Sequence, residues 1–215
     1  ENRLGHKYLA GIGEDHYGTP FEGISGYPNY NGIRTFDKAA LKRMLEAAGL
    51  LRQRWYYPFP DYKIPNVILS EEVFSNEGFD WLALLELPTA SIGAAEKAVF
   101  NEREFLKAAA RNTDVSVLMN SFLVFASAAE GLDPAPDVLA VKMNSLRDKK
   151  LKTATFFKGS GRQVTVLSKG SGSKPPAVPY FFGYKNLGLE IVDALCLNDA
   201  ARAAGLFEKW RAFVG

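Results

Sequence analysis

Two short groups of polar residues near the start of the chain carry side chains suited to acid–base chemistry and anion binding. The first group is Glu1, Asn2 and Arg3, and the second is Glu14, Asp15 and His16. An imidazole exchanges protons near neutral pH and two carboxylates precede His16, so we expect His16 to be the best general base. The guanidinium of Arg3 could hold an anion such as a phosphate or a uronate. Alternatively, Asp15 and His16 organise a glycine-rich loop through hydrogen bonds to its backbone.

The composition fits a folded protein and argues against several kinds of site. Hydrophobic residues make up 47% of the chain and charged residues 23%, and the formal net charge of +2 gives no reason to expect nucleic acid or an anionic membrane as partner. Cys196 is the one cysteine, so we expect no intrachain disulfide and no metal site. It lies in the apolar run 191–197, which predicts a small buried side chain. No apolar stretch is long enough to span a bilayer, and we expect a cytoplasmic protein.

The elements that would position the polar groups begin with a long loop. Residues 1–34 contain seven glycines and several tyrosines, which is typical of an ordered functional loop. The spacing of apolar residues predicts an amphipathic helix over 38–48, with Asp37 as its N-cap and Gly49 as its left-handed stop. Strands are predicted over 53–59 and 65–70.

The rest of the chain mixes helices and strands. Helices are predicted over 79–87 and 94–111, and the apolar run 122–126 predicts that 116–127 contains a strand covered on both faces. Gly131, Pro134 and Pro136 mark a boundary, so we expect a domain at 1–129, a linker at 130–137 and a small α+β domain at 138–215. Within that last domain the predicted strands are 138–143, 153–157 and 163–167, and the predicted helices are 187–197 and 198–213.

Several separate motifs occur in a fixed order. They are Glu1-Asn2-Arg3-Leu4-Gly5, Lys7-Tyr8-Leu9-Ala10-Gly11, Glu14-Asp15-His16, Gly32-Ile33-Arg34-Thr35-Phe36, Ala47-Ala48-Gly49-Leu50, the run 55–65, and the run 120–126. Together, over residues 1–70 and 116–127, they resemble the C-terminal third of a class I S-adenosylmethionine-dependent methyltransferase. The closest subset is the group found in bacterial polysaccharide and lipopolysaccharide gene clusters.

The resemblance implies an α+β fold that holds a fragment of a Rossmann-like methyltransferase sheet. Glu1–Gly5 would be the exit of the fifth strand, 55–65 would hold the sixth, and 120–126 would be the antiparallel seventh. A small region of antiparallel sheet and helices would follow. The glycine-rich turn that receives the cofactor in such enzymes has no counterpart here. We therefore expect S-adenosylmethionine in the parent enzyme and no cofactor bound by this chain alone.

The same resemblance implies roles for individual residues. The loop after the fifth strand borders the acceptor site, which implies a sugar or glycan acceptor held by Glu1, Asn2, Arg3, Glu14 and Asp15, with His16 as the base. Tyr57 could form an aromatic wall for a sugar ring, or pack in the core. The expected partners are the missing N-terminal half of the methyltransferase or a glycosyltransferase.

Two further expectations remain open. The order of strands and helix in the last third weakly resembles a kinase-like small lobe, with Lys169 and Glu190 as its only candidates, although a surface lysine is the simpler interpretation of Lys169. Alternatively, the whole chain is a non-catalytic α+β module that docks on a glycosyltransferase or a methyltransferase. In the methyltransferase interpretation, the missing strands leave an exposed sheet edge, so we expect the fragment to build its own sheet from residues 53–59, 65–70 and 117–126 or to pair edges in a dimer.

Overall fold

The computed structural model describes residues 1–85, 99–129, 136–144, 152–160, 163–170, 178–179 and 187–214. The chain divides into two compact units, Glu1–Tyr180 and Phe181–Gly215, each described here by itself. The class is α+β, as predicted. The boundary between the units does not fall at the predicted linker 130–137, because the sheet of the first unit continues on both sides of that segment.

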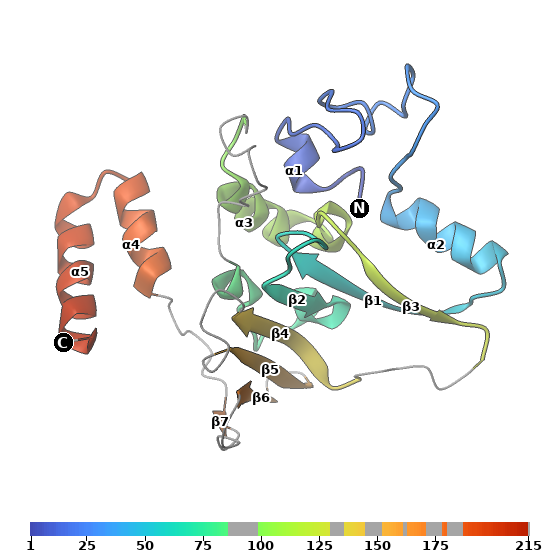
Figure 1. Ribbon diagram of the computed structural model, residues 1–215. Coiled ribbons are helices and arrows are strands. Elements are labelled where there is room, and N and C mark those ends of the chain that lie inside the picture. Colours follow the sequence, from blue (N-terminus) through green and yellow to red (C-terminus); the bar gives the residue numbers. More distant parts are fainter. Residues whose placement is uncertain are drawn as a thin grey trace. The chain divides into compact units, whose positions relative to one another are not determined.

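The first unit is built on one seven-stranded sheet with the order β3-β1-β2-β4-β5-β6-β7 (Figure 1). All of the pairings described are antiparallel. Its strands are β1 (Arg52–Phe59), β2 (Val67–Ser70), β3 (Leu123–Ser127), β4 (Val138–Asn144), β5 (Thr153–Ser160), β6 (Gln163–Gly170) and β7 (Val178–Pro179). Its helices are α1 (His6–Leu9), α2 (Lys38–Ala47) and α3 (Glu102–Asn112), with the short 3₁₀ turns η1 (Glu71–Ser75), η2 (Trp81–Leu84) and η4 (Val115–Leu118).

Local signals explain α2 and its neighbours. The Asp37 carboxylate accepts a hydrogen bond from Ala40 N at 2.7 Å, and Gly49 ends the helix with a φ of +81°. Strand β1 then pairs with β2 and with β3, as expected for a sheet closed by 53–59, 65–70 and 117–126. Strands β4, β5 and β6 confirm the three strands predicted beyond residue 137.

Three predicted elements differ from the structure. The expected helix 79–87 contains only η2, and α3 starts at Glu102, where Asn101 caps it; residues 86–98 lie outside the described residues. The segment 116–127 begins as η4 and becomes strand only at Leu123. That strand, β3, was expected to be covered on both faces. This was wrong, because β3 is the edge of the sheet and its side chains are half-buried or exposed.

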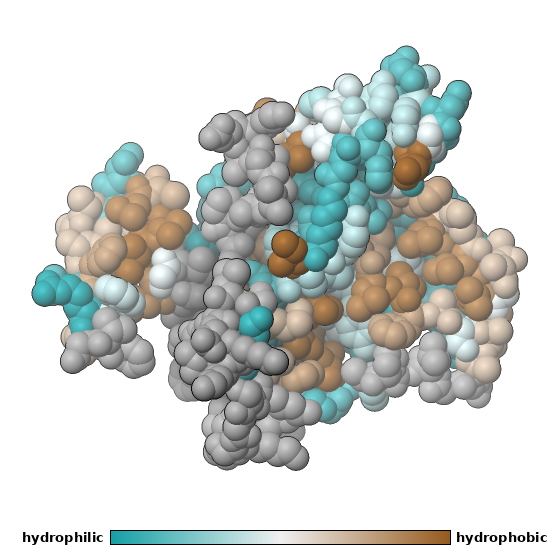
Figure 2. Space-filling model, viewed as in Figure 1, coloured by the Kyte–Doolittle hydropathy of each residue, from teal (hydrophilic) through white to brown (hydrophobic). Residues whose placement is uncertain are grey.

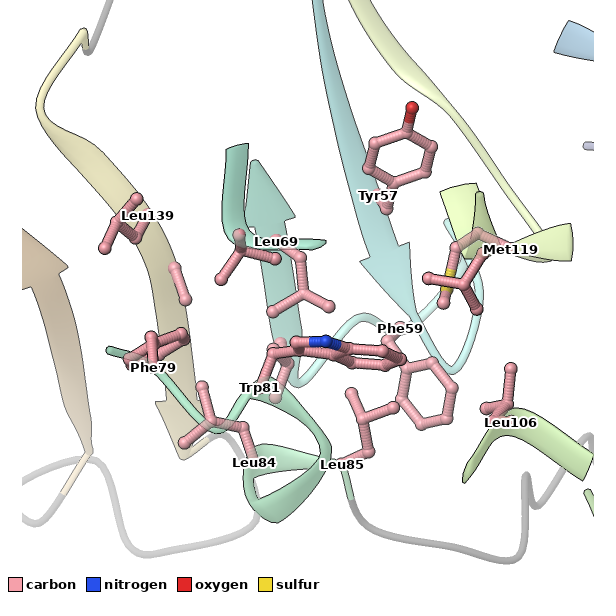
Figure 3. Packing of buried hydrophobic residues seen from close by; sticks show 14 of the residues in the cluster. Tyr57, Phe59, Leu69, Phe79, Trp81, Leu84, Leu85, Leu106, Met119 and Leu139 are labelled. Carbon is pink, nitrogen blue, oxygen red and sulfur yellow. The ribbon is translucent and has the colours of Figure 1, made fainter. Parts of the chain in front are cut away.

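The core lies where β1, β2 and β4 meet the turn η2 and helix α3. Figure 3 shows Trp81 of η2 packed among side chains from these elements, with Phe59 and Leu69 beside it. Aromatic rings meet edge-on in this cluster: Phe74 and Trp81 are 5.1 Å apart at 89°, and Trp55 and Phe122 are 5.4 Å apart at 85°. The core therefore fixes the end of β1 and the loop that follows it, against which the first residues of the chain pack.

The second unit is a two-helix hairpin of α4 (Leu187–Cys196) and α5 (Ala200–Val214). The seam between these helices consists of Ile191, Ala194, Ala203 and Leu206. No described helix is long and apolar enough to cross a membrane.

Candidate functional site

A buried group of charged side chains lies where the first residues of the chain meet the loop after β1. Lys7 Nζ donates to Glu1 Oε1 at 3.0 Å and lies 3.7 Å from Asp61 Oδ2. Tyr8 OH donates to Glu1 Oε2 at 2.8 Å. The side chains of Lys7 and Glu1 are only 5% and 7% exposed. One buried ammonium group thus lies between two carboxylates.

The environment of Glu1 fixes its charge. Burial raises the pKa of Glu1, but the Lys7 ammonium and the hydrogen bonds from Tyr8 and Lys7 outweigh it, so the pKa of Glu1 lies below its ordinary value. Burial and the neighbouring Glu1 carboxylate raise the pKa of Tyr8. At neutral pH, Glu1 is therefore an ionised hydrogen-bond acceptor and Tyr8 a donor. An ionised carboxylate of lowered pKa is a weak base, so Glu1 is not suited to removing a proton, and both of its oxygens hold Lys7 and Tyr8 in place.

The loop after β1 connects this group with Asp15. Asp61 Oδ1 accepts a hydrogen bond from Lys63 N at 2.8 Å, and the ammonium of Lys63 pairs with the Asp15 carboxylate. This second pair lies at the surface, with Asp15 53% and Lys63 45% exposed. His16 follows Asp15 on the exposed side of the same turn. The structure thus brings Glu1 and Asp15, two predicted site residues, to one loop, with His16 beside Asp15.

Asn2 is fully buried and holds the backbone before β3. Its Nδ2 donates to Val117 O at 2.8 Å and to Met119 O at 2.7 Å, and its backbone N donates to Asn120 O at 2.9 Å. Its Oδ1 accepts from Leu4 N at 3.1 Å. The amide is occupied by the backbone, so in this structure Asn2 is a structural residue and does not reach an acceptor.

Arg3 is engaged with the cap of α2. Its Nε donates to Asp37 Oδ2 at 2.8 Å, and its Nη2 bonds to the same oxygen. The other oxygen of Asp37 caps the helix. Burial raises the pKa of Asp37, but the Ala40 amide and the Arg3 guanidinium lower it by more. An anionic acceptor would have to compete with Asp37 for Arg3.

Glu14 belongs to a buried hydrogen-bond network inside the glycine-rich loop. Tyr27 OH lies 2.7 Å from Glu14 Oε1 and accepts from Thr35 N at 2.8 Å, and Thr35 Oγ1 donates to the same Glu14 oxygen at 3.3 Å. A side chain at Gly23 would place its Cβ 2.1 Å from Glu14 Oε1, so this position needs glycine. The network fixes the shape of residues 14–35, and Glu14 is 5% exposed. Glu14 therefore organises the loop that presents Asp15 and His16.

Tyr57 lies inside the core and is 0% exposed. Its ring packs edge-on against Phe74 at 5.1 Å and Phe122 at 6.0 Å, and the Lys38 ammonium lies 5.5 Å from the ring centroid. Burial raises the pKa of Tyr57. Packing is the role that the structure gives Tyr57, since no surface of its ring is open to a sugar.

The sequence-based site omitted the residues that bind the predicted ones. Lys7, Tyr8 and Asp61 surround Glu1, and Tyr27 and Thr35 surround Glu14. Lys7, Tyr8 and Thr35 belong to the sequence motifs, but nothing near them in the sequence shows that they contact a carboxylate. Within the described ranges, no group of three or more His, Cys, Asp or Glu side chains is arranged to hold a metal ion.

Comparisons with known proteins add no family. No protein-family model, no curated protein and no solved structure matches the chain.

Proposed function

We propose that this chain is the C-terminal portion of an S-adenosylmethionine-dependent O-methyltransferase that acts on a sugar or glycan in cell-surface polysaccharide biosynthesis. The observation that carries the proposal is the pairing at the sheet edge. Strand β3 is antiparallel to β1, and Asn2 N bonds to Asn120 O, three residues before β3 begins. A strand entering at Glu1 would run antiparallel to β3, along the edge that no described strand occupies, as the fifth strand of such an enzyme would beside the seventh.

The surface beside that edge supports the proposal. Leu123 is 39% exposed, and Val124, Phe125 and Ala126 are half-buried. Figure 2 shows hydrophobic residues gathered over β1 and β3. Helix α2 has no fully buried residue, and Met44 is 51% exposed. An exposed strand edge beside apolar side chains is a usual place for a further strand to add.

The proposed roles follow from charge and exposure. His16 is exposed and can take a proton from an acceptor hydroxyl, with Asp15 next to it. Glu1 would stand at the exit of the proposed fifth strand, where its buried charge holds Lys7 and Tyr8. Asn2 and Glu14 hold the two segments that carry these groups, and Tyr57 supports the sheet beneath them.

The cofactor would supply the methyl group when bound. The residues described here do not fit its site, because every described strand pairing is antiparallel and no strand among them leads through a glycine-rich turn into a helix. The proposal therefore places the cofactor site in a segment encoded before Glu1.

Two measurements test this proposal. The gene should encode a strand, a glycine-rich turn and a helix upstream of Glu1, and calorimetry on the longer product should show binding of S-adenosylmethionine. If no such motif precedes Glu1 and the longer product binds no S-adenosylmethionine, the proposal is wrong.

The second candidate is a non-catalytic α+β module that docks on a glycosyltransferase or a methyltransferase. Among the described residues β3 is the last strand of the sheet, which favours this candidate equally, because a partner's strand could add there. A Leu123→Lys variant, at the exposed side chain of β3, should then lose the partner in co-purification. In the methyltransferase the same variant should disturb the enzyme's own sheet and lower its thermal stability.

A further inference from the structure

Three cationic side chains near Glu1 and His16 are already paired with carboxylates. These ion pairs are Arg3 with Asp37, Lys7 with both Glu1 and Asp61, and Lys63 with Asp15. An anionic group on an acceptor would have to displace a carboxylate from one of these cations. The pairing therefore argues against the expectation that Arg3 holds a phosphate or a uronate.

The two segments that contain the candidate site carry more acidic than basic side chains. Over residues 1–37 and 60–66 the acidic ones are Glu1, Glu14, Asp15, Glu22, Asp37 and Asp61, and the basic ones are Arg3, Lys7, Arg34 and Lys63. The formal net charge of these segments is −2 with histidine neutral. Glu14 and Glu22 are 5% and 7% exposed, and they accept hydrogen bonds from uncharged groups, Tyr27 OH and Asn29 N. An acceptor with its own negative charge would therefore be repelled here.

The loop that carries His16 also holds two tyrosine rings in contact. Tyr17 directly follows His16, and its ring centroid lies 4.8 Å from that of Tyr30 at an angle of 47°. The backbone fixes the Tyr30 ring, because Ile33 N donates to its hydroxyl at 3.3 Å and a Cβ at Gly32 would lie 2.2 Å from that hydroxyl. Both tyrosines are half-buried, so part of each ring remains open to a ligand beside His16.

Arg34 places further hydrogen-bond donors at this pair of rings. Its Nη2 donates to Tyr30 O at 3.1 Å and to Asn31 Oδ1 at 3.4 Å, and its guanidinium carbon lies 5.5 Å from the centroid of the Tyr27 ring. These contacts hold an exposed side chain in one place. Among the described residues none accepts a hydrogen bond from its Nε or Nη1, and these atoms can donate to a ligand.

We propose that Tyr17 and Tyr30 bind the apolar face of an uncharged pyranose, while Arg34 donates hydrogen bonds to its hydroxyl groups. A pyranose offers C–H groups on its faces, which pack on an aromatic ring, and hydroxyl groups at its rim. The negative charge of the surrounding segments disfavours uronic acids and sugar phosphates. This inference rests on the proposed function for its choice of a sugar as the ligand, and it names the class of that sugar.

Nuclear magnetic resonance titration of the full chain tests the proposal. The probes are the methyl glycosides of glucose, galactose and mannose, and the charged comparisons are glucuronic acid, galacturonic acid and mannose 1-phosphate. We expect at least one neutral glycoside to bind, and its charged counterpart to bind at least about 5-fold more weakly. High salt should narrow this difference, because it screens the repulsion.

Two variants identify the contact. Tyr17→Ala should raise the Kd for the neutral glycoside at least about 10-fold, whereas Tyr17→Phe keeps the ring and is the matched control. Arg34→Gln should also raise this Kd without improving the binding of the charged sugars. Hydrogen exchange over residues 14–35 should show that each variant keeps the loop folded.

The outcomes separate this inference from the proposed enzyme. A chain that binds no sugar of the panel, that binds the charged sugars as tightly as the neutral ones, or that is unaffected by Tyr17→Ala would overturn the inference. These titrations need neither the cofactor nor the segment before Glu1. A longer product that binds S-adenosylmethionine but prefers the charged sugars would therefore overturn this inference alone. A chain that binds neutral sugars without any cofactor motif upstream would overturn only the enzyme.

Discussion

Asn2 and Asn120 join the start of the chain to the segment that leads into β3. Asn2 N donates to Asn120 O at 2.9 Å, while Asn120 Oδ1 accepts from Lys7 N at 3.0 Å and its Nδ2 donates to Pro60 O at 2.9 Å. Both side chains are buried. The two asparagines therefore fix the direction of the chain at Glu1, the end of β1 and the start of β3 relative to one another.

Replacing Asn2 should destabilise the first unit strongly. Asn2→Ala removes two hydrogen bonds to the buried carbonyls of Val117 and Met119, so we expect a loss of about 2–4 kcal/mol in the free energy of unfolding. Urea denaturation followed by tryptophan fluorescence measures it. Asn29→Ala, at an exposed asparagine, should change stability by less than about 0.5 kcal/mol. Equal effects of the two variants would contradict the role given to Asn2.

Position 5 requires glycine because the backbone of Asn120 lies close to it, and not because of its backbone angles. Its φ is −58°, but an added Cβ would lie 2.9 Å from the Cα of Asn120. Gly5→Ala should therefore lower the melting temperature of the first unit. Gly205→Ala is the matched comparison, because a Cβ at Gly205 meets no atom within 4 Å and alanine favours the helix by about 1 kcal/mol. A destabilised Gly205→Ala variant would show that this position has a contact.

Acid should weaken the Arg3–Asp37 connection. The pKa of Asp37 is lower in the folded chain than in the unfolded one, so its stabilising contribution is complete above the unfolded value, near pH 4, and is lost as the pH falls through the folded value. Asp37→Asn keeps a capping side chain but removes the charge, and its stability should vary less with pH below 4. Urea denaturation at several pH values measures the difference. Asp15→Asn, at a surface pair, should keep most of the wild-type slope.

The sequence predicted elements with local signals and failed where a distant neighbour decides. The helix at 38–48 follows from its cap at Asp37, its apolar spacing and Gly49, all of which are near in sequence. An apolar run such as 122–126 is compatible with a central strand and with an edge strand, so the position of β3 in the sheet could not be derived from it. Cys196 was expected to be buried and is exposed, because helix α4 (Leu187–Cys196) packs on α5 (Ala200–Val214) through Ile191 and Ala194, on the face opposite Cys196.

The candidate site shows the same limit. His16 and Asp15 were found from their types, and the structure leaves both at the surface. Glu1 pairs with Lys7 of helix α1, and Lys7 also pairs with Asp61 of the loop after β1, which is 60 residues from Glu1 in the sequence. The two fully buried members of the predicted site, Asn2 and Tyr57, serve the fold: the Asn2 amide bonds to backbone groups, and the Tyr57 ring packs in the core, which was the alternative stated for it.

Removing one hydroxyl should loosen the loop that carries His16. Tyr27→Phe leaves the buried Glu14 carboxylate without its shortest hydrogen bonds and Thr35 N without its acceptor, which should cost about 2–4 kcal/mol. Hydrogen exchange should then become faster in residues 14–35 while β1 and β2 stay protected. Tyr17→Phe, at a half-buried tyrosine, is the control and should leave exchange in this loop unchanged. Protection unchanged in Tyr27→Phe would contradict the role of the network.

His16 provides the sharpest test of the proposed chemistry, because its exposure separates catalysis from folding. In the longer gene product, His16→Gln should lower kcat for methyl transfer to a sugar acceptor by about 100-fold or more if the imidazole removes the acceptor proton. The melting temperature should not change, since an exposed side chain contributes little to stability. The neighbouring variant Asp15→Asn should keep most of the activity. A His16→Gln variant with full activity would remove His16 from the mechanism and leave the loop with a structural role.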